Sequence, residues 1–398
     1  MIRYILFILF FLNVFTKSDV YFTKIISPEK IVELYEKLNI KLTEPIGLKI
    51  HTGEKNGPYY LRPSFLKDIY NYTNGTFIEC NVAYRGSRYT TELHKELLKY
   101  NGWSQYRTLI MDESEENDII LKVNNPHIIS ENIVGENLNN FNSCLVLSHF
   151  KGHGMGGFGG ALKQLGIGFA SRAGKTYIHT AGKTKDYKEL WSKVATQLDF
   201  TAAMADAAST IVNYFKNKGG IAYINVLANI SKSCDCTGIR AAEPRIRNIG
   251  ILASIDPVAI DKACYDLIAK ENNPGSQEWI KQSESKFGLN TLNKAVEHEL
   301  GSLEYNLIDI DNEYNESIPI SYTNKNNSEA KILSNEEPKN DNDKKYDNSF
   351  KKVLFSVTFI SIILIIMIAI IYNVKRRKKG NLVANEDLGQ SSSPEEKV

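Results

Sequence analysis

The sequence predicts an α/β fold with a largely parallel sheet, or sheets, and helices on both faces, followed by one C-terminal transmembrane helix. Short runs rich in β-branched residues alternate with segments of helical period through the first 305 residues of the 398-residue chain. A strongly polar segment and a long uncharged apolar run follow. These three observations divide the chain into an anchor and a folded part that is large enough for one domain or two lobes.

The first 18 residues are expected to be a signal peptide. Arg3 precedes an apolar run, Tyr4 to Phe15, whose length suits a signal peptide and is too short to span a bilayer. Thr16 and Ser18 supply the small residues that a signal peptidase recognises. The chain is therefore expected to enter the secretory pathway, with a folded domain over residues 19–305.

Six apolar runs within this domain are expected to be strands, because they are short and rich in β-branched residues. They are Ile46–Gly53, Thr76–Tyr84, Thr108–Asp112, Cys144–Phe150, Ile221–Ile230 and Ile249–Ser254. Helical spacing of apolar residues predicts helices over 64–72, 90–100, 198–220 and 256–270. The last of these begins with Asp256 as a capping residue and Pro257 in the first turn.

The C-terminal part is expected to form a stalk, a membrane span and a tail. Residues 306–352 are too polar to bury enough apolar surface to offset the entropy of ordering, which predicts a disordered stalk. Residues 353–374 carry no charge, and at ~1.5 Å per helical residue they cross the roughly 30 Å hydrocarbon core. The five basic residues 375–379 place the tail, 375–398, in the cytosol.

This topology predicts a single-pass type I protein of the plasma membrane or an endomembrane, with the domain outside the cell or in a lumen. Glycosylation is expected because five sequons fall on that side, at Asn71, Asn74, Asn229, Asn315 and Asn326. The net charge is only +2, and much of the basic surplus lies beside the span. No basic face remains for nucleic acid, so nucleic acid is not an expected partner.

A glycine-rich block, His153 to Gly168, follows the expected strand Cys144–Phe150. Glycines bring little apolar surface and a high entropy cost, so packing alone does not explain their density. The block predicts that a small molecule approaches the backbone closely. The cofactor-binding residues expected from it are Gly156, Gly157, Gly159 and Gly160, with Lys163 and, in the basic stretch that follows, Lys175.

The glycines also match the GxGxxG pattern of dinucleotide-binding proteins between Gly154 and Gly159. Such sites need an acidic residue about 20 positions later to hold the ribose. No Asp or Glu occurs from Gly160 to Lys185, so a conventional NAD site is not expected.

From about Ile46 to Lys270 the chain resembles the DUF362 family, whose members are domains of unknown function. Three motifs carry the resemblance in the family's order: the block His149–Lys175, the sequence Ser-Cys-Asp-Cys at 233–236, and the segment Ile249–Ile268. Many members also carry ferredoxin-like cysteine clusters between the first two motifs. Residues 180–233 contain no cysteine, so an iron–sulfur cluster is not expected.

The glycine block more distantly resembles the nickel-pincer lactate racemase family. In that family a histidine lies ten residues before the lysine that attaches the pincer nucleotide, and a nickel-binding histidine lies sixteen residues after it. His153, Lys163 and His179 reproduce both spacings. The resemblance implies a shared pocket in which His153 and Lys163 are catalytic and His179 is a metal ligand. A nickel-pincer cofactor is an alternative, and the cofactor stays open.

Arg88 stands where that family has another acid/base histidine, within Gly86–Tyr89. A guanidinium cannot act as a base near neutral pH, so racemisation by two bases is not expected. Arg88 is instead expected to hold a substrate carboxylate in bidentate fashion. Asp261 follows an apolar turn on the expected helix 256–270 and is included as a fourth catalytic candidate, whereas capping accounts for Asp256.

The five cysteines leave three alternatives open. Cys234 and Cys236 lie on one face if their segment is extended, and two thiolates could begin a soft-metal site. An exported protein more often forms disulfides, here to Cys80, Cys144 or Cys264 because the spacing is too short for an easy bridge between Cys234 and Cys236. Free buried thiols are the third alternative.

Two functions are therefore considered. The first is an enzyme or binding domain that takes a small molecule or cofactor at the glycine-rich His/Lys site, with the reaction unassigned. The second is a non-catalytic surface protein, used for adhesion or ligand capture, on an inherited enzyme fold. The retained glycine block favours the first function, and the missing cysteine cluster and acid/base histidine favour the second.

Overall fold

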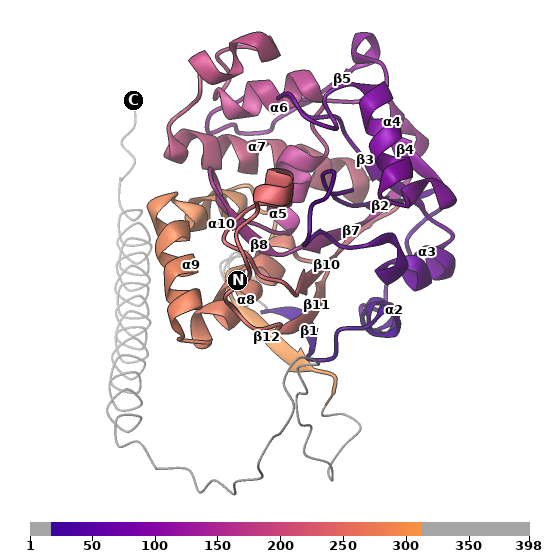
Figure 1. Cartoon of the computed structure of the whole chain (residues 1–398), viewed down its shortest axis with the longest axis vertical. Coiled ribbons are helices and arrows are strands. Elements are labelled where there is room, and N and C mark those ends of the chain that lie inside the picture. The colour runs from indigo at the N-terminus through magenta and orange to yellow at the C-terminus, as the bar shows by residue number, and fades with distance from the viewer. Residues whose placement is uncertain (1–16, 312–398) are drawn as a thin grey trace, which may run out of the picture. The chain divides into compact units, whose positions relative to one another are not determined.

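An eight-stranded sheet runs through residues 17–311, which are the residues that the computed structural model describes (Figure 1). In spatial order its strands are β12 (Tyr305–Asp309), β1 (Ser18–Thr23), β11 (Gly250–Ser254), β10 (Ile221–Leu227), β7 (Ser143–His149), β2 (Ile46–Lys49), β3 (Thr76–Glu79) and β4 (Thr108–Ile110). All neighbouring pairs are parallel except the two that β11 makes with β1 and β10. The expected α/β fold with a largely parallel sheet is confirmed.

The six strands predicted from apolar runs are all present, but two end well before their runs do. β2 ends at Lys49 rather than Gly53, and β3 ends at Glu79 rather than Tyr84. The apolar residues beyond these points stay buried although they have left the sheet, as Ile50 and Val82 do. These segments lie at the carboxyl ends of parallel strands, where α/β proteins build their ligand sites.

The outer strands β1 and β12 were not predicted, and they correct both expected boundaries of the domain. β1 begins at Ser18, whose hydroxyl donates to Asp256 Oδ2 at 2.6 Å, so Ser18 belongs to the domain and not to a signal peptide. β12 pairs along its length with β1, so residues 306–311 belong to the domain and not to a stalk. β12 is a short edge strand with no buried side chain, so a reading based on apolar runs did not find it.

Four helices match the segments predicted from helical spacing, and their caps explain where they begin. They are α3 (Lys67–Thr73), α4 (Thr91–Tyr100), α7 (Gln197–Lys216) and α8 (Pro257–Lys270). The Thr90 hydroxyl accepts a hydrogen bond from the amide of Leu93 at the start of α4. Asp256 Oδ1 accepts from the amides of Val258 and Ala259 at the start of α8, as its expected capping role requires.

The remaining helical and strand segments are shorter or more polar, and none was predicted. The helices are α2 (Pro28–Lys37), α6 (Arg172–His179), α9 (Pro274–Ser285) and α10 (Gly288–Glu297), together with short turns at Pro63–Phe65, Trp103–Gln105, Glu115–Asn117, Glu136–Asn140, Tyr187–Ser192 and Asp235–Arg240. Two further strands, β5 (Ile119–Lys122) and β6 (Glu131–Val134), form a separate antiparallel pair.

Helices cover both faces of the sheet, because alternate side chains of each central strand enter different apolar clusters. On β7, Leu145 and Leu147 pack with residues of α2, α3 and α4, whereas Cys144 and Val146 pack with residues of α7, α8 and α10. Figure 1 shows α2 and α3 on one side of the strands and α8 and α10 on the other. The sheet is therefore buried on both faces, as its apolar runs require.

The described residues form one unit rather than two lobes. No helix within residues 17–311 is long and apolar enough to cross a bilayer. The expected signal-peptide core, most of the stalk, the span 353–374 and the tail 375–398 lie outside the described residues.

Candidate functional site

The glycine-rich block folds into a hairpin and a pair of short helices at the end of β7. β8 (Lys151–His153) pairs antiparallel with β9 (Gly157–Gly159), and the chain continues into α5 (Ala161–Lys163) and the π-helical turn η5 (Gln164–Gly168). His153 ends β8, Lys163 ends α5 and His179 ends α6. Single π-helical turns occur frequently at functional sites.

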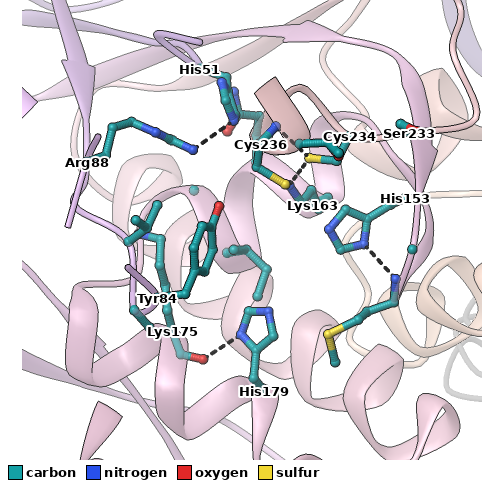
Figure 2. Close-up of a pocket in the computed structure, with 18 of the residues that line it drawn as sticks. His51, Tyr84, Arg88, His153, Lys163, Lys175, His179, Ser233, Cys234 and Cys236 are labelled. Atoms are coloured by element: carbon teal, nitrogen blue, oxygen red, sulfur yellow. Dashed lines mark hydrogen bonds between the residues drawn. The ribbon is translucent and has the colours of Figure 1, made fainter. Parts of the chain in front are cut away.

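A cavity of about 410 Å³ lies where the segments that follow β2, β3, β7 and β10 meet. Five predicted site residues line it, namely Arg88, His153, Lys163, Lys175 and His179 (Figure 2). The volume falls in the range of small-molecule sites. None of the described residues that line the cavity is an aspartate or glutamate.

The four glycines expected to bind a cofactor have protein neighbours instead, and none of them lines the cavity. A Cβ on Gly160 would lie 2.3 Å from Asp261 Oδ1, and a Cβ on Gly157, whose φ is +77°, would lie 2.7 Å from the Cα of Gly288. Gly156 and Gly159 sit against His153 and Lys163. Close packing of the hairpin thus explains their lack of side chains, and the glycines that do line the cavity are Gly154 and Gly168.

Asp261 does not reach the cavity, which corrects its assignment as a catalytic residue. Its carboxylate is fully buried and accepts hydrogen bonds from the amides of Ala161 and Leu162 at 2.7 and 2.9 Å. The side-chain amide of Asn225 donates a third bond at 2.7 Å. Asp261 therefore holds the first turn of α5, and through it the backbone that carries Lys163.

Arg88 lines the cavity, but its guanidinium is already occupied by protein carboxylates. It contacts Glu54 Oε1 at 2.8 Å and Glu79 Oε2 at 3.3 Å, and it lies 3.2 Å from His51 Nε2. Although burial opposes the charge, Glu54 and neighbouring groups raise the pKa of Arg88 above its usual range. This arrangement fixes Arg88 as a buried structural cation and does not support a bidentate clamp for a substrate carboxylate.

Cys234 and Cys236 meet Lys163 and His153 on one wall of the cavity (Figure 2). Lys163 Nζ lies 3.6 Å from Cys234 Sγ, and the amide of Cys236 donates to the same sulfur at 3.4 Å. The ligand atoms of His153, Cys234 and Cys236 all lie within 4.8 Å of one another. A hydrogen bond from Cys236, with Lys163 and His153 close by, holds the pKa of Cys234 well below its usual range.

The hydrogen bonds of His153 fix which of its nitrogens carries the proton. Nδ1 lies 2.8 Å from the amide nitrogen of Gly156 and 3.3 Å from that of Met155, so it accepts from N–H donors. Burial lowers the pKa of His153, which favours the neutral ring. The single proton therefore sits on Nε2, and the imidazole acts as a donor toward Cys234.

Asp235 explains why the two cysteines face the cavity together. Its carboxylate points away from them into a buried ion cluster, with His149 Nδ1 at 2.9 Å and Lys151 Nζ at 2.9 Å. His149 Nε2 donates to the carbonyl of Ala228 at 2.7 Å, so both ring nitrogens face acceptors and the ring is an imidazolium. The ion cluster anchors the middle of the Cys-Asp-Cys motif and turns both thiols toward Lys163.

His179 presents a free lone pair to the cavity. Its Nδ1 donates to the carbonyl of Lys175 at 2.7 Å, which leaves Nε2 as the unprotonated nitrogen of the neutral ring. A metal-binding histidine commonly makes such a backbone bond. Within residues 17–311, however, the two groups of three His, Cys, Asp and Glu that could hold a metal are His153 with Cys234 and Cys236, and His127 with Asp206 and His298, so His179 belongs to neither group.

A family model described as "Domain of unknown function (DUF362)" matches residues 46–266, which is more than half of the chain. The chain belongs to the DUF362 family. The match covers β2 through most of α8; it includes the first two motifs on which the resemblance was based and all but the last two residues of the third. No curated protein matches the chain.

Solved structures that match this DUF362 protein include the lactate racemase apoprotein from Thermoanaerobacterium thermosaccharolyticum, at 13% identity and a TM-score of 0.37. Another is a structural-genomics target from Thermotoga maritima, at 13% identity and a TM-score of 0.35. The matches cover 62% and 68% of this chain but only 57% and 58% of those chains. The chain thus spans less than two thirds of either structure.

All five cysteines of the DUF362 domain are free thiols, so the expected disulfides are absent from it. Sequence reasoning did not place Cys234 and Cys236 in the site, although they belong to one of the family motifs. It also missed His51, Tyr84 and Trp191, which line the cavity from separate loops. A signal for His51 and Tyr84 was present in the sequence. The apolar runs that contain them, Ile46–Gly53 and Thr76–Tyr84, continue past the ends of β2 and β3.

In this DUF362 domain His179 is expected to titrate near pH 4. Burial disfavours the imidazolium and lowers the pKa of His179 from 6.5 to about 4. Between these values the unfolded chain binds more protons than the folded one, so protonation of His179 lowers the stability of the fold as the pH falls from 6.5 to 4. NMR titration of the imidazole, assigned with the variant His179→Gln, measures this pKa. A value of 6 or above would contradict the buried, neutral ring.

Proposed function

We propose that this DUF362 domain binds an anionic small molecule in the cavity at the glycine-rich His/Lys site. The observation that carries the proposal is the charge of the wall. Lys163, Lys175 and Lys232 line the cavity, and no carboxylate of residues 17–311 forms a salt bridge with any of them. A cavity whose wall carries lysines and no carboxylate attracts anions and concentrates them.

The neutral groups of the wall would orient such a ligand. His179 offers an acceptor at Nε2, while His153 and Tyr84 offer donors, so that a ligand with both a charged and a hydroxyl group is held at two points. Trp191 and Met155 add apolar surface. Lys163 is the group we assign to direct contact with the anion, because α5 and Asp261 fix its backbone.

We further propose that the domain is exported and anchored by residues 353–374, as a single-pass protein with a cytosolic tail. The three sequon asparagines within the described residues, Asn71, Asn74 and Asn229, are exposed, as glycosylation requires. The leader then ends before Ser18, since β1 needs that residue. The alternative function is a non-catalytic surface protein.

Lys163→Met is expected to weaken anion binding by about 10- to 100-fold, because it removes one charge-assisted hydrogen bond. Trp191 provides the signal: it is 66% exposed at the cavity, whereas Trp103 and Trp279 are buried. Its fluorescence in the full-length protein is titrated with citrate, inorganic phosphate and adenosine monophosphate. Native mass measurement of the same sample detects any anion that co-purifies.

Lys188→Met is the matched control, since Lys188 is exposed and does not line the cavity. It is expected to bind as the parent does. If Trp191 responds to none of the three anions and the folded protein carries no added mass, the anion site is contradicted and the surface-protein function becomes the better one.

A further inference from the structure

We propose that Cys234 and Cys236 form a redox-active thiol–disulfide pair, in which Cys234 attacks a small disulfide that enters the cavity and Cys236 resolves the mixed disulfide. This activity shares the cavity and Lys163 with the proposed anion binding, but it does not rest on that proposal. It rests on the placement of the two sulfurs among N–H donors and on their access to the cavity.

The surroundings of Cys234 Sγ are those of a thiolate. The Lys163 amine at 3.6 Å and the Cys236 amide at 3.4 Å both direct N–H groups to the sulfur, and the protonated Nε2 of His153 faces it. The thiolate is the nucleophilic form of cysteine, and cationic and N–H donors stabilise it. The direction of the pKa of each sulfur agrees: the side-chain hydrogen bond between the two sulfurs lowers the pKa of Cys234 and raises the pKa of Cys236.

A metal ion on the same three residues is disfavoured by the protonation of His153. A metal-bound imidazole must offer a lone pair on the ligating nitrogen and keep its proton on the other. Nδ1 of His153 faces two amide donors and cannot hold that proton without a clash, so Nε2 keeps it. The histidine is therefore built to donate to sulfur.

Only this pair of cysteines can meet a disulfide substrate. Cys234 and Cys236 both line the cavity, whereas Cys80, Cys144 and Cys264 are completely buried and do not (Figure 2). Burial also raises the pKa of Cys144 to about 12 and the pKa of Cys264 well above its usual range. These three cysteines serve as internal controls.

The reaction balances without any further reagent. The Cys234 thiolate attacks one sulfur of the substrate R–S–S–R, forms a mixed disulfide and releases RS⁻, which takes the proton of Cys236. The Cys236 thiolate then attacks the Cys234 sulfur, forms the Cys234–Cys236 disulfide and releases the second RS⁻, which takes from water the proton that Cys234 gave up when it ionised. Two protein thiols are oxidised, and one small disulfide is reduced to two thiols. The one-residue spacing gives a strained ring, and strained disulfides are easily reduced again.

The test equilibrates the full-length protein in mixtures of reduced and oxidised glutathione, alkylates the remaining thiols, and weighs the peptides. Cys234 and Cys236 are expected to become oxidised together within one peptide, while the other three cysteines stay reduced. In Cys236→Ser a mixed disulfide with glutathione should accumulate at Cys234. In Cys234→Ser the reaction of Cys236 at pH 7 should slow by at least about tenfold.

Lys163→Met tests whether Lys163 stabilises the Cys234 thiolate or has only a structural role. Loss of the amine should move the midpoint of the pH profile of Cys234 alkylation upward. Lys188→Met should leave that midpoint unchanged. The proposal would be overturned by oxidation of the two cysteines independently of each other, by stoichiometric metal that protects both from alkylation, or by a midpoint near the ordinary thiol value of about 8.5.

Discussion

Replacing Glu79 by glutamine is expected to lower the free energy of unfolding by about 3–5 kcal/mol, because it leaves buried cations without their counter-charge. Glu79 is 3% exposed and lies between Lys49 Nζ at 2.9 Å and Arg88 at 3.3 Å. Although burial opposes its ionisation, these two cations hold the pKa of Glu79 far below its usual range. A glutamine would set an amide N–H₂ against groups that are all donors.

The same carboxylate accepts hydrogen bonds from the amides of Thr52 and Cys80 at 3.1 and 3.0 Å, so the substitution also loosens the segments that follow β2 and β3. Urea unfolding followed by circular dichroism measures the loss. The control is Glu189→Gln, which removes the acid of an exposed pair with Lys193 and should leave the urea midpoint nearly unchanged. Equal losses in the two variants would contradict the buried cluster.

Asp235→Ala is expected to have an effect of similar size, again about 3–5 kcal/mol, because Lys151 and the His149 imidazolium lose their only carboxylate partner within the described residues. Most of the cost falls on Lys151, which is 4% exposed. The variant should also react more slowly at Cys234, since the ion cluster no longer holds the Cys-Asp-Cys motif against β7 and β8.

Glu278→Gln is the control for this substitution, because Glu278 pairs with Arg245 on the surface, where both side chains are about half exposed. Its effect on urea unfolding should stay within about 1 kcal/mol. If Asp235→Ala unfolds at the same urea concentration as the parent protein and keeps the parent's alkylation rate at Cys234, the ion cluster does not position the thiols.

The central strands and four of the helices, α3, α4, α7 and α8, could be predicted because burial leaves a periodic pattern in the chain. β7, for example, is buried at every position and contains the uninterrupted apolar run Cys144–Leu147. The edge strand β12 could not be predicted, because its side chains alternate little and are partly exposed. Hydrogen bonds with β1, which are invisible in a pattern of side chains, decide its structure.

Some residues of the site could likewise be predicted from the sequence, and others could not. His153, Lys163 and His179 could be predicted from their spacing around the glycine block, and the cavity brings all three together. Arg88 was expected to hold a substrate carboxylate, but Glu54 and Glu79 bind its guanidinium. Asp261 was expected to be catalytic, but backbone amides bind its carboxylate. Cys234 was missed because its reactivity depends on Lys163, which is 71 residues away in the sequence.

The pairing of β12 with β1 has a mechanical consequence. Because the two strands run parallel, the start of β1 and the end of β12 lie at opposite ends of the pair. A pull on the chain beyond Asp311, with the start of β1 held, therefore acts along the strands and loads their hydrogen bonds together in shear, whereas an antiparallel hairpin would open one bond at a time. The last strand of the domain is thus suited to transmit tension without peeling from the sheet.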